Sequence, residues 1–387
     1  MALTVSSLEL YQFRNYRHFS LENPGKVTVF IGENAVGKTN LLEALHLVCA
    51  CHSFRHATSD QLIINEAEDG QSRVCAILDD DSRHLTVEMR IRERKRQYLL
   101  NGKARRSAEI RGLAPSVVFT PDDLLLVKGA QNDRRMSLDA LGEQLRPGYQ
   151  SVRLDYLDVF RHKNKLLKEG YGEDYLAAIN DMIVTCGAQL SFYRASLFDR
   201  FAPKIIERYH QLSSGKENLT CEYRPSWVEH GHLDLPSGTE DDGHYHPVNL
   251  TRDDARDFIR QSLDNRLADE MIRQRAFIGP HMDKILFSID GKDASVYASQ
   301  GQQRSIVLAW KLAEVDLIQE YLHTAPILLL DDVMSELDAS RREALEACIS
   351  SCAQAFITTT NLGYFSESLL KNAAVIHLPL EENSAVS

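Results

Sequence analysis

The sequence predicts an α/β fold in which a core built from both ends of the chain carries an attached antiparallel β-subdomain and a helical arm. A β-branched strand at 27–32 leads through a glycine-containing loop into a helical pattern. Strand-like alternation returns at 73–103, and apolar residues recur at helical spacing from 132 to about 210. An apolar strand followed by two acids comes near the end. The predicted parts are 1–131 (N-terminal lobe of the core with the antiparallel sheet), 132–275 (helical arm) and 276–387 (C-terminal lobe).

Length and composition bound the class of protein. The 387 residues, 43% hydrophobic and 26% charged, predict a soluble globular chain with more than one domain. No apolar run of about 18 residues is present and the N-terminus has no signal-peptide pattern, so we expect a cytoplasmic protein without membrane contact. Seven cysteines without paired C-x-x-C spacing indicate reduced thiols. The net charge of -11 excludes a protein that is basic all over, but not one with a local basic face.

The stretch "GENAVGKT" has the spacing of a phosphate-binding loop. Gly32 and Gly37 allow backbone amides to surround a phosphate, Lys38 places a cation on the β and γ phosphates, and the Thr39 hydroxyl is a magnesium ligand. Leu41, Leu42, Leu45 and Val48 share one face of the helix expected after it. We expect nucleotide contacts from Gly32, Glu33, Asn34, Ala35, Val36, Gly37, Lys38, Thr39 and Asn40.

"ILLLDD" predicts a buried strand that delivers carboxylates at its tip. Asp331 is the candidate magnesium ligand together with Thr39, since such a strand holds the metal ion that bridges nucleotide phosphates. Asp332 would orient or activate the attacking water. The catalytic candidates are therefore Asp332 and Lys38, with ATP and Mg²⁺ as cofactors.

"YASQGQQRS" stands about thirty residues before that strand and opens an apolar helix. Amides and a hydroxyl at a helix start can hold an anion, so Ser299, Gln300, Gly301 and Gln302 are candidate nucleotide contacts. The alternative is an ordinary helix start at which Ser299 is the N-cap.

A basic stretch, "RIRERKRQYLLNGKARRSAEIR", lies in the predicted antiparallel sheet. Asn101-Gly102 indicates a hairpin turn, because both central positions of a type I′ turn need positive φ. The stretch is either a DNA-binding face or a solvated hairpin edge. The DNA-binding candidates are Arg92, Arg94, Lys95, Arg96, Lys103, Arg105 and Arg106.

The segment 228–249 is rich in Gly, Pro, Asp and His and predicts a surface loop. His230, His232, His244 and His246 also suggest a metal site. The loop is preferred, because no carboxylate or thiol framework accompanies the histidines.

The order of these motifs resembles that of the ATP-binding-cassette ATPases, which implies an ABC-type P-loop ATPase head. In that superfamily the S-x-G-Q segment of one subunit completes the ATP site of another, so the resemblance implies a dimer that forms on ATP. Ser335, Leu337 and Asp338 match the D-loop, which crosses the same interface. In "AFITTTN" the usual switch histidine is replaced by Thr359, Thr360 or Asn361.

About 290 residues separate the two halves of the site, as in the DNA-repair branch of this SMC-like superfamily. The chain most resembles the RecF family of bacterial DNA replication and repair ATPases. That resemblance is carried by "LELYQFRNY", "GENAVGKTNLLEAL", "SFR", "NGK", "FTPDDLLLVKGAQNDRRMSLD", "GPHMDK", "SQGQQRS" and "DDVMSELD". Met136 departs from the usual aromatic before Leu-Asp, and Met282 replaces a usual basic residue.

Resemblance to this family implies an ATP-dependent DNA-binding recombination mediator. It implies dimerisation on ATP and binding of gapped DNA at single-strand/double-strand junctions. It also implies loading of recombinase with the partners RecR and RecO, in repair and replication restart. Slow, DNA-stimulated ATP hydrolysis would act as a conformational switch. The alternative is another ABC/SMC-like ATPase coupled to a nuclease or signalling partner.

Overall fold

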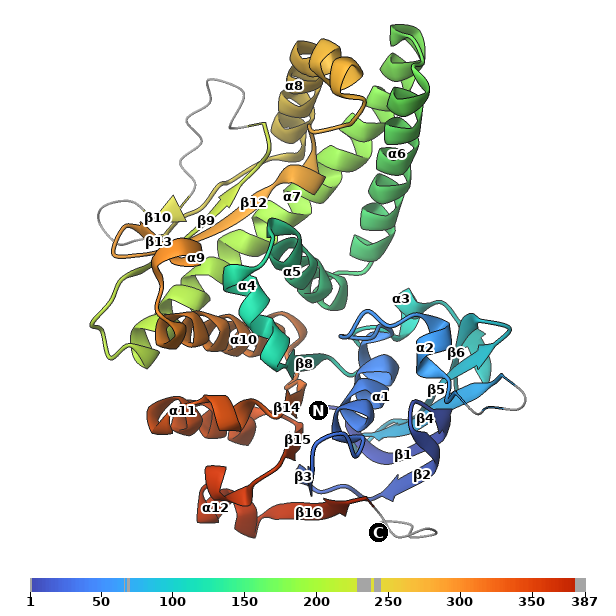
Figure 1. Cartoon of the computed structure of the whole chain (residues 1–387), viewed down its shortest axis with the longest axis vertical. Helices are drawn as coiled ribbons and strands as arrows, with labels where there is room; N and C mark the ends of the chain where they lie inside the picture. Colours follow the sequence, from blue (N-terminus) through green and yellow to red (C-terminus); the bar gives the residue numbers. More distant parts are fainter. Residues whose placement is uncertain (1, 66, 68–69, 228–237, 240–244, 380–387) are drawn as a thin grey trace. The chain divides into compact units, whose positions relative to one another are not determined.

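The computed structural model describes residues 2–65, 67, 70–227, 238–239 and 245–379 (Figure 1). The chain forms two compact units, one of Met1–Asp123 with Glu314–Ser387 and one of Leu124–Ala313. This division differs from the predicted boundaries, because it groups 276–313 with the helical unit. The reason is a long-range strand pair: strand β12 (Lys284–Ile289) pairs along its whole length with β9 (Leu219–Arg224).

The first unit contains a parallel sheet of five strands in the order β16-β3-β15-β14-β8 (Figure 1). Strand β15 lies between β3 and β14, so the loop after β3 and the acids after β14 come out at one edge of the sheet, on either side of the end of β15. The strands are β3 (Val27–Gly32), β8 (Ser116–Phe119), β14 (Ile327–Asp331), β15 (Gln354–Thr359) and β16 (Ala373–Leu378).

The same unit contains an antiparallel sheet in the order β2-β1-β4-β5-β6-β7, which confirms the predicted β-subdomain. The predicted turn joins β6 to β7, with φ of 49° at Asn101 and 74° at Gly102, as a type I′ turn requires. The strands are β1 (Thr4–Phe13), β2 (Tyr16–Glu22), β4 (Ser72–Asp79), β5 (His84–Arg92), β6 (Lys95–Leu100) and β7 (Lys103–Arg105).

Helix α1 (Lys38–Ala50) contacts strands of both sheets. Every residue of α1 except Thr39 and Asn40 is buried. The sequence predicted a helix with a single buried apolar face. The buried surface is wider than this, because a helix that packs against two sheets buries polar positions as well. The other helices of this unit are α2 (Ser59–Leu62), α3 (Ser107–Ile110), η3 (Val333–Glu336), α11 (Ala339–Ser351), η4 (Leu362–Tyr364) and α12 (Glu367–Lys371), and η1 (Pro121–Leu124) ends at the boundary between the units.

The second unit is mostly helical, as predicted for the arm. Its centre is α7 (Glu173–Leu212), which contacts α5, α6 and α8. The remaining elements are α4 (Leu125–Lys128), α5 (Gln131–Leu145), α6 (Tyr149–Glu169), α8 (Arg252–Arg273), η2 (Pro280–Met282), α9 (Ala294–Tyr297), β10 (Gly238–Thr239), β11 (Tyr245–His246) and β13 (Lys292–Asp293). Helix α10 (Gln300–Leu322) begins in this unit and ends in the first. Among the helices described, none is long and apolar enough to cross a membrane.

A buried polar cluster forms part of the core of the second unit. Arg194 donates to both carboxylate oxygens of Asp139 at 2.8 Å, and the Tyr149 hydroxyl donates to the same carboxylate at 2.7 Å. Asp283 lies 3.7 Å from Arg194 and accepts a hydrogen bond from Tyr223. Asp139 belongs to the "RRMSLD" stretch and Asp283 to "GPHMDK", so two of the stretches that carry the family resemblance contribute charged side chains to the core.

The two departures from the family pattern fall at the surface of this unit. Met136 and Met282 are each 37% exposed, whereas Arg134 and Asp283 beside them are buried. A side chain at the surface is less constrained by its neighbours than one inside the buried cluster.

Candidate nucleotide-binding site

The phosphate loop lies between β3 and α1 and is braced by the turn between β1 and β2. Gly37 precedes α1 with φ of 109°. A Cβ at this position would lie 2.5 Å from Asn15 Nδ2 and 2.8 Å from the Tyr16 hydroxyl oxygen. Asn15 Nδ2 also donates to the Val36 carbonyl at 3.1 Å. Glycine is therefore required at position 37 both for its backbone angle and for the close approach of this turn.

Lys38 is held against the loop by its ammonium group. The Nζ atom donates to the carbonyls of Gly32 at 2.7 Å and Glu33 at 2.8 Å. Burial lowers the pKa of Lys38, and the negative charges of Asp332 and Asp331 oppose that shift. The cation thus lies where the phosphate loop meets the paired acids, and its contact with a phosphate stays a prediction.

Asp331, at the end of β14, joins the two halves of the site. Its Oδ1 accepts a hydrogen bond from Thr39 Oγ1 at 2.9 Å and another from Thr358 Oγ1 at 2.8 Å. Burial raises the pKa of Asp331, and these two hydrogen bonds and the charges of Arg55 and Lys38 lower it. The predicted pair of magnesium ligands, Thr39 and Asp331, is therefore in direct contact.

Asp332 follows in a left-handed conformation, with φ of 51°. Its backbone nitrogen donates to Thr358 Oγ1 at 3.0 Å, which fixes the turn after β14. Its Oδ1 atom is buried and has no hydrogen-bond partner in the described chain. Burial raises the pKa of Asp332, and Lys38 lowers it. This Oδ1 atom is therefore available to accept a hydrogen bond from a water molecule, while the oxygens of Thr39 and Asp331 are of the kind that a hard cation such as Mg²⁺ takes as ligands.

The switch strand reaches the acids through Thr358, a residue that the sequence reasoning missed. Of the three residues proposed to replace the histidine, Thr359 Oγ1 donates to the Asn361 carbonyl at 3.1 Å, and Thr360 donates its backbone N–H to Asp332. The parallel register pairs Asp331 with Thr358. Strand periodicity alone did not give this register, because it depends on how two distant strands align.

Ser299 to Gln302 belong to the second unit, at the start of α10. Ser299 Oγ accepts from the Gln302 backbone nitrogen at 3.2 Å, and the Gln302 side chain accepts from the Ser299 backbone nitrogen at 2.8 Å. These reciprocal bonds form a capping box. The alternative of an N-cap at Ser299 is therefore confirmed, and a nucleotide contact would be an additional role.

The D-loop residues make local contacts in the first unit. Ser335 Oγ donates to the Asp332 carbonyl at 2.8 Å, and Asp338 caps α11 by accepting from the Arg341 backbone nitrogen at 3.0 Å. The Asp338 side chain is 55% exposed. Ser335 thus supports the turn that carries Asp332.

The basic stretch forms two successive hairpins at one edge of the antiparallel sheet. Arg94 is 82% and Arg106 92% exposed, and Arg94 lies 3.4 Å from Asp60. Arg96 is only partly exposed and donates to the Ala57 carbonyl, while Arg105 lies 3.3 Å from Glu109. The other candidates are exposed: Arg92, Lys95 and Lys103. The cations of the hairpins therefore differ in exposure and in whether they contact a carboxylate or carbonyl of the protein.

The predicted histidine loop lies largely outside the described residues, with His230, His232 and His244 among those left out, and His246 ends β11. Within the described ranges, no three His, Cys, Asp or Glu residues are grouped so as to hold a metal ion.

Comparison with known proteins supports the interpretation of the motifs. A family model described as RecF/RecN/SMC N terminal domain matches residues 4–382. A curated "DNA replication and repair protein RecF" from Synechococcus sp. (strain JA-3-3Ab) is 35% identical over 380 residues, 96% of this chain and 95% of the relative. The protein of that name from Symbiobacterium thermophilum is 36% identical over 369 residues, 92% of each chain.

Solved structures show the same relationship. The structure described as "recombination mediator protein RecF-ATPrS in RecFOR pathway" superposes with a TM-score of 0.82 at 27% identity and covers 94% of both chains. An Smc head bound to the C-winged helix domain of ScpA gives a TM-score of 0.52 at 15% identity, covering 99% of this chain and 95% of that one, which shows a shared fold.

Proposed function

This chain belongs to the RecF family, and we propose that it is an ATP-dependent recombination mediator whose nucleotide site lies in its first unit. The bond between Thr39 and Asp331 carries the proposal, because it joins the phosphate loop to the acidic strand tip. Lys38, within the electrostatic reach of Asp331 and Asp332, adds the cation that a triphosphate needs.

Magnesium would be held by Thr39 and Asp331, and when bound it neutralises charge on the β and γ phosphates. The chain's own residues provide the rest. Lys38 binds the phosphates, and Asp332 orients the attacking water through the carboxylate oxygen that has no protein partner. Hydrolysis is proposed to be slow, DNA-stimulated and used as a switch.

ATP is proposed to join two copies of the chain head to tail. Ser299, Gln300, Gly301 and Gln302 of one copy would contact the nucleotide held by the other, because the positive end of the helix dipole at a helix start favours an anion. Ser335 and Asp338 would lie at the same interface. Such a dimer is favoured by ATP only to the extent that the γ-phosphate makes contacts that the monomer lacks.

DNA is proposed to bind the exposed cations of the two hairpins, with gapped duplex and its single-strand/double-strand junctions as the target. RecR and RecO are proposed as partners, since the related structure is described as part of the RecFOR pathway. The overall charge of -11 restricts such binding to a local face of this kind.

The test has two stages. The affinity of a fluorescent ATP analogue is measured with Mg²⁺ for the wild type and Lys38→Ala, with Lys371→Ala on the exposed end of α12 as control. We expect the affinity to fall about 10- to 100-fold for Lys38→Ala and to stay unchanged for Lys371→Ala. A loss of this size is the usual effect of removing a hydrogen bond to a charged group.

Solution mass is then measured without nucleotide, with ADP, and with ATP and Mg²⁺, each with and without gapped DNA. A dimer that forms only with ATP and then retains DNA supports the mediator. Nucleotide binding that is indifferent to DNA and leaves the protein monomeric would instead favour an ABC/SMC-like ATPase coupled to a nuclease or signalling partner.

A further inference from the structure

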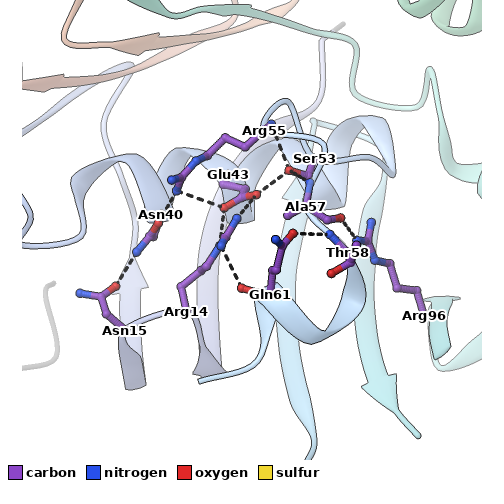
Figure 2. Close-up of polar contacts among 10 residues, drawn as sticks. All are labelled: Arg14, Asn15, Asn40, Glu43, Ser53, Arg55, Ala57, Thr58, Gln61 and Arg96. Carbon is purple, nitrogen blue, oxygen red and sulfur yellow. Dashed lines mark hydrogen bonds and ion pairs between the residues drawn. The ribbon is translucent and has the colours of Figure 1, made fainter. Parts of the chain in front are cut away.

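The buried carboxylate of Glu43 is the centre of a polar cluster beside the phosphate loop (Figure 2). Glu43 lies in α1, one turn after Thr39, and its side chain is fully buried. Both carboxylate oxygens accept from Arg14 at 2.8 Å, and Ser53 Oγ donates to Oε1 at 2.5 Å. A second guanidinium, that of Arg55, lies 3.9 Å from Oε2.

The two arginines around Glu43 differ in their hydrogen bonds and in their exposure. Arg14 makes two parallel bonds to the carboxylate and a third bond to the Gln61 carbonyl, and its side chain is 16% exposed. Arg55 is 45% exposed and stands farther from the carboxylate. One carboxylate cannot balance two guanidinium groups, so Arg14 neutralises Glu43 and the charge of Arg55 remains in excess.

The excess charge lies on the nucleotide side of the cluster. Arg55 Nη1 donates to Asn40 Oδ1 at 3.1 Å, and Asn40 Nδ2 donates to Asn15 Oδ1 at 2.7 Å. Asn15 in turn donates to the Val36 carbonyl of the phosphate loop at 3.1 Å. Figure 2 shows this path from Arg55 to Asn15. Arg55 is therefore connected by hydrogen bonds to the phosphate loop, through Asn40, which follows the proposed magnesium ligand Thr39 in the chain.

Ser53 fixes the backbone that carries Arg55. Its hydroxyl oxygen accepts from the backbone nitrogens of Arg55 at 3.1 Å and Ala57 at 3.3 Å while it donates to Glu43. Glu43 thus acts on Arg55 twice, through the carboxylate that faces the guanidinium and through the hydroxyl that closes the turn.

We infer that Glu43 is a positioning residue for the nucleotide site, which holds Arg55 so that its positive charge favours ATP over ADP. The inference rests on the proposed function. The γ-phosphate adds negative charge at the end of the nucleotide where Lys38, Asp331 and Arg55 act, so a cation fixed there stabilises the triphosphate more than the diphosphate. Glu43 itself stays buried and touches no nucleotide.

The test is the ratio of ATP to ADP affinity, measured by displacement of a fluorescent nucleotide with Mg²⁺. Arg55→Ala is expected to lower the ratio about five- to tenfold, the effect of one partly exposed charge-assisted contact. Glu43→Asp keeps the charge but is too short to hold both arginines, and Ser53→Ala opens the turn without leaving a buried charge unpaired. Each is expected to lower the ratio by a similar factor.

Gln61→Ala is the matched control. It removes the side-chain oxygen that accepts a hydrogen bond from the Thr58 backbone nitrogen in the same segment, and leaves the Gln61 backbone carbonyl that Arg14 contacts. This variant is expected to keep the wild-type ratio. Melting temperature is measured for every variant, so that a general loss of fold is separated from a change in nucleotide preference.

A double variant decides between positioning and general stabilisation. If Ser53 and Glu43 act through Arg55, Ser53→Ala/Arg55→Ala has the same ratio as Arg55→Ala alone. Additive effects, or an unchanged ratio in folded Ser53→Ala and Glu43→Asp, would overturn the inference. A wild type that binds neither nucleotide would contradict the proposed function itself, together with this inference.

Discussion

Thr39 Oγ1 donates a hydrogen bond of 2.9 Å to Asp331 Oδ1 across 292 residues of sequence. The hydroxyl comes from the first turn of α1 and the carboxylate from the end of β14. Because β15 separates β3 from β14 in the sheet, the two side chains meet across the end of an intervening strand. The same β15 supplies Thr358, whose hydroxyl donates to the same oxygen. The proposed magnesium ligands therefore come from opposite ends of the chain and share one hydrogen-bond network.

Asp331→Asn is expected to weaken nucleotide binding only when magnesium is present. The amide keeps an oxygen that can accept from Thr39 and Thr358 but loses the charge that a divalent cation requires. We expect the affinity for an ATP analogue to fall about 10- to 100-fold in Mg²⁺ and to change less than about twofold in chelator. Asp122→Asn, at an exposed carboxylate in the same unit, is the control. An equal loss in chelator would contradict a metal role.

Asp331→Asn is expected to weaken nucleotide binding but to stabilise the protein without nucleotide at neutral pH. Burial raises its pKa above the unfolded value of 3.8, so the folded state holds this proton more tightly than the unfolded state does. The carboxyl therefore contributes stability below pH 3.8 that is lost as pH rises through the folded-state pKa. Asparagine does not titrate, so the Asp331→Asn variant does not lose this stability as pH rises. The difference in melting temperature between the variant and the wild type is therefore expected to increase from about pH 4 to about pH 7, and a difference that does not depend on pH would contradict the effect of burial on the pKa of Asp331.

Replacing Ser299 separates helix capping from nucleotide contact. Ser299→Ala loses the capping box and is expected to cost about 0.5–2 kcal/mol of stability. It should leave ATP binding by the monomer largely intact and abolish the ATP-dependent dimer, measured as solution mass. Loss of ATP binding by the monomeric variant would count against a site shared between two copies.

Ser299→Asp is the matched variant, because aspartate caps helices as well as serine does but places a negative charge against a triphosphate. We expect its melting temperature to return to the wild-type value while the dimer stays absent. Recovery of the dimer would show that Ser299 acts only as a cap.

The two hairpins can be tested through the salt dependence of DNA binding. Lys95→Gln and Arg106→Gln each remove an exposed cation, and each phosphate that is no longer neutralised should reduce the slope of log affinity against log salt by about 0.9. Arg96→Gln should change the slope less, because its guanidinium already donates to Ala57. Lys371→Gln is the control. Equal slopes for all four variants would show that the DNA does not bind at these hairpins.

The buried cluster of the second unit should be essential for stability. Arg194→Ala leaves the Asp139 carboxylate buried without its cation, which is expected to cost about 3–5 kcal/mol. Arg260→Ala removes an ion pair with Asp181 of the same 2.8 Å length, but with side chains 52% and 64% exposed, and should cost less than about 1 kcal/mol. Urea titration measures both, and similar losses would argue against a structural role for the cluster.

The elements predicted best were those with a local cause. The strand before the phosphate loop, the turn at Asn101-Gly102 and the helix start at Ser299 each depend on residues a few positions apart. The prediction failed at elements whose partners are distant. Strand β9 was missed, and the grouping of 276–313 with the helical unit follows from its pairing with β12.

The candidate site shows the same division. Lys38, Thr39 and Asp331 were identified because their motifs are contiguous, and the structure places them together. Thr358 was not identified, because the sequence reasoning named only the three residues that follow it, and the contact with Asp331 depends on the register of β15 against β14. The roles of Asp332, the helix start at Ser299 and the basic hairpins remain predictions for the experiments above.

The sequence by itself determined which segments are candidates to bind phosphate, which of them form the main strands and helices, and which family the chain resembles, because these follow from residue type and short-range spacing. Only the tertiary structure decided which side chains act on one another. In the sequence, Glu43 is one more polar residue of a helix. The packing of α1 against two sheets buries its carboxylate between Arg14 and Arg55, and a buried charge must be paired by whatever groups the fold brings to it. Long-range register and packing set those partners.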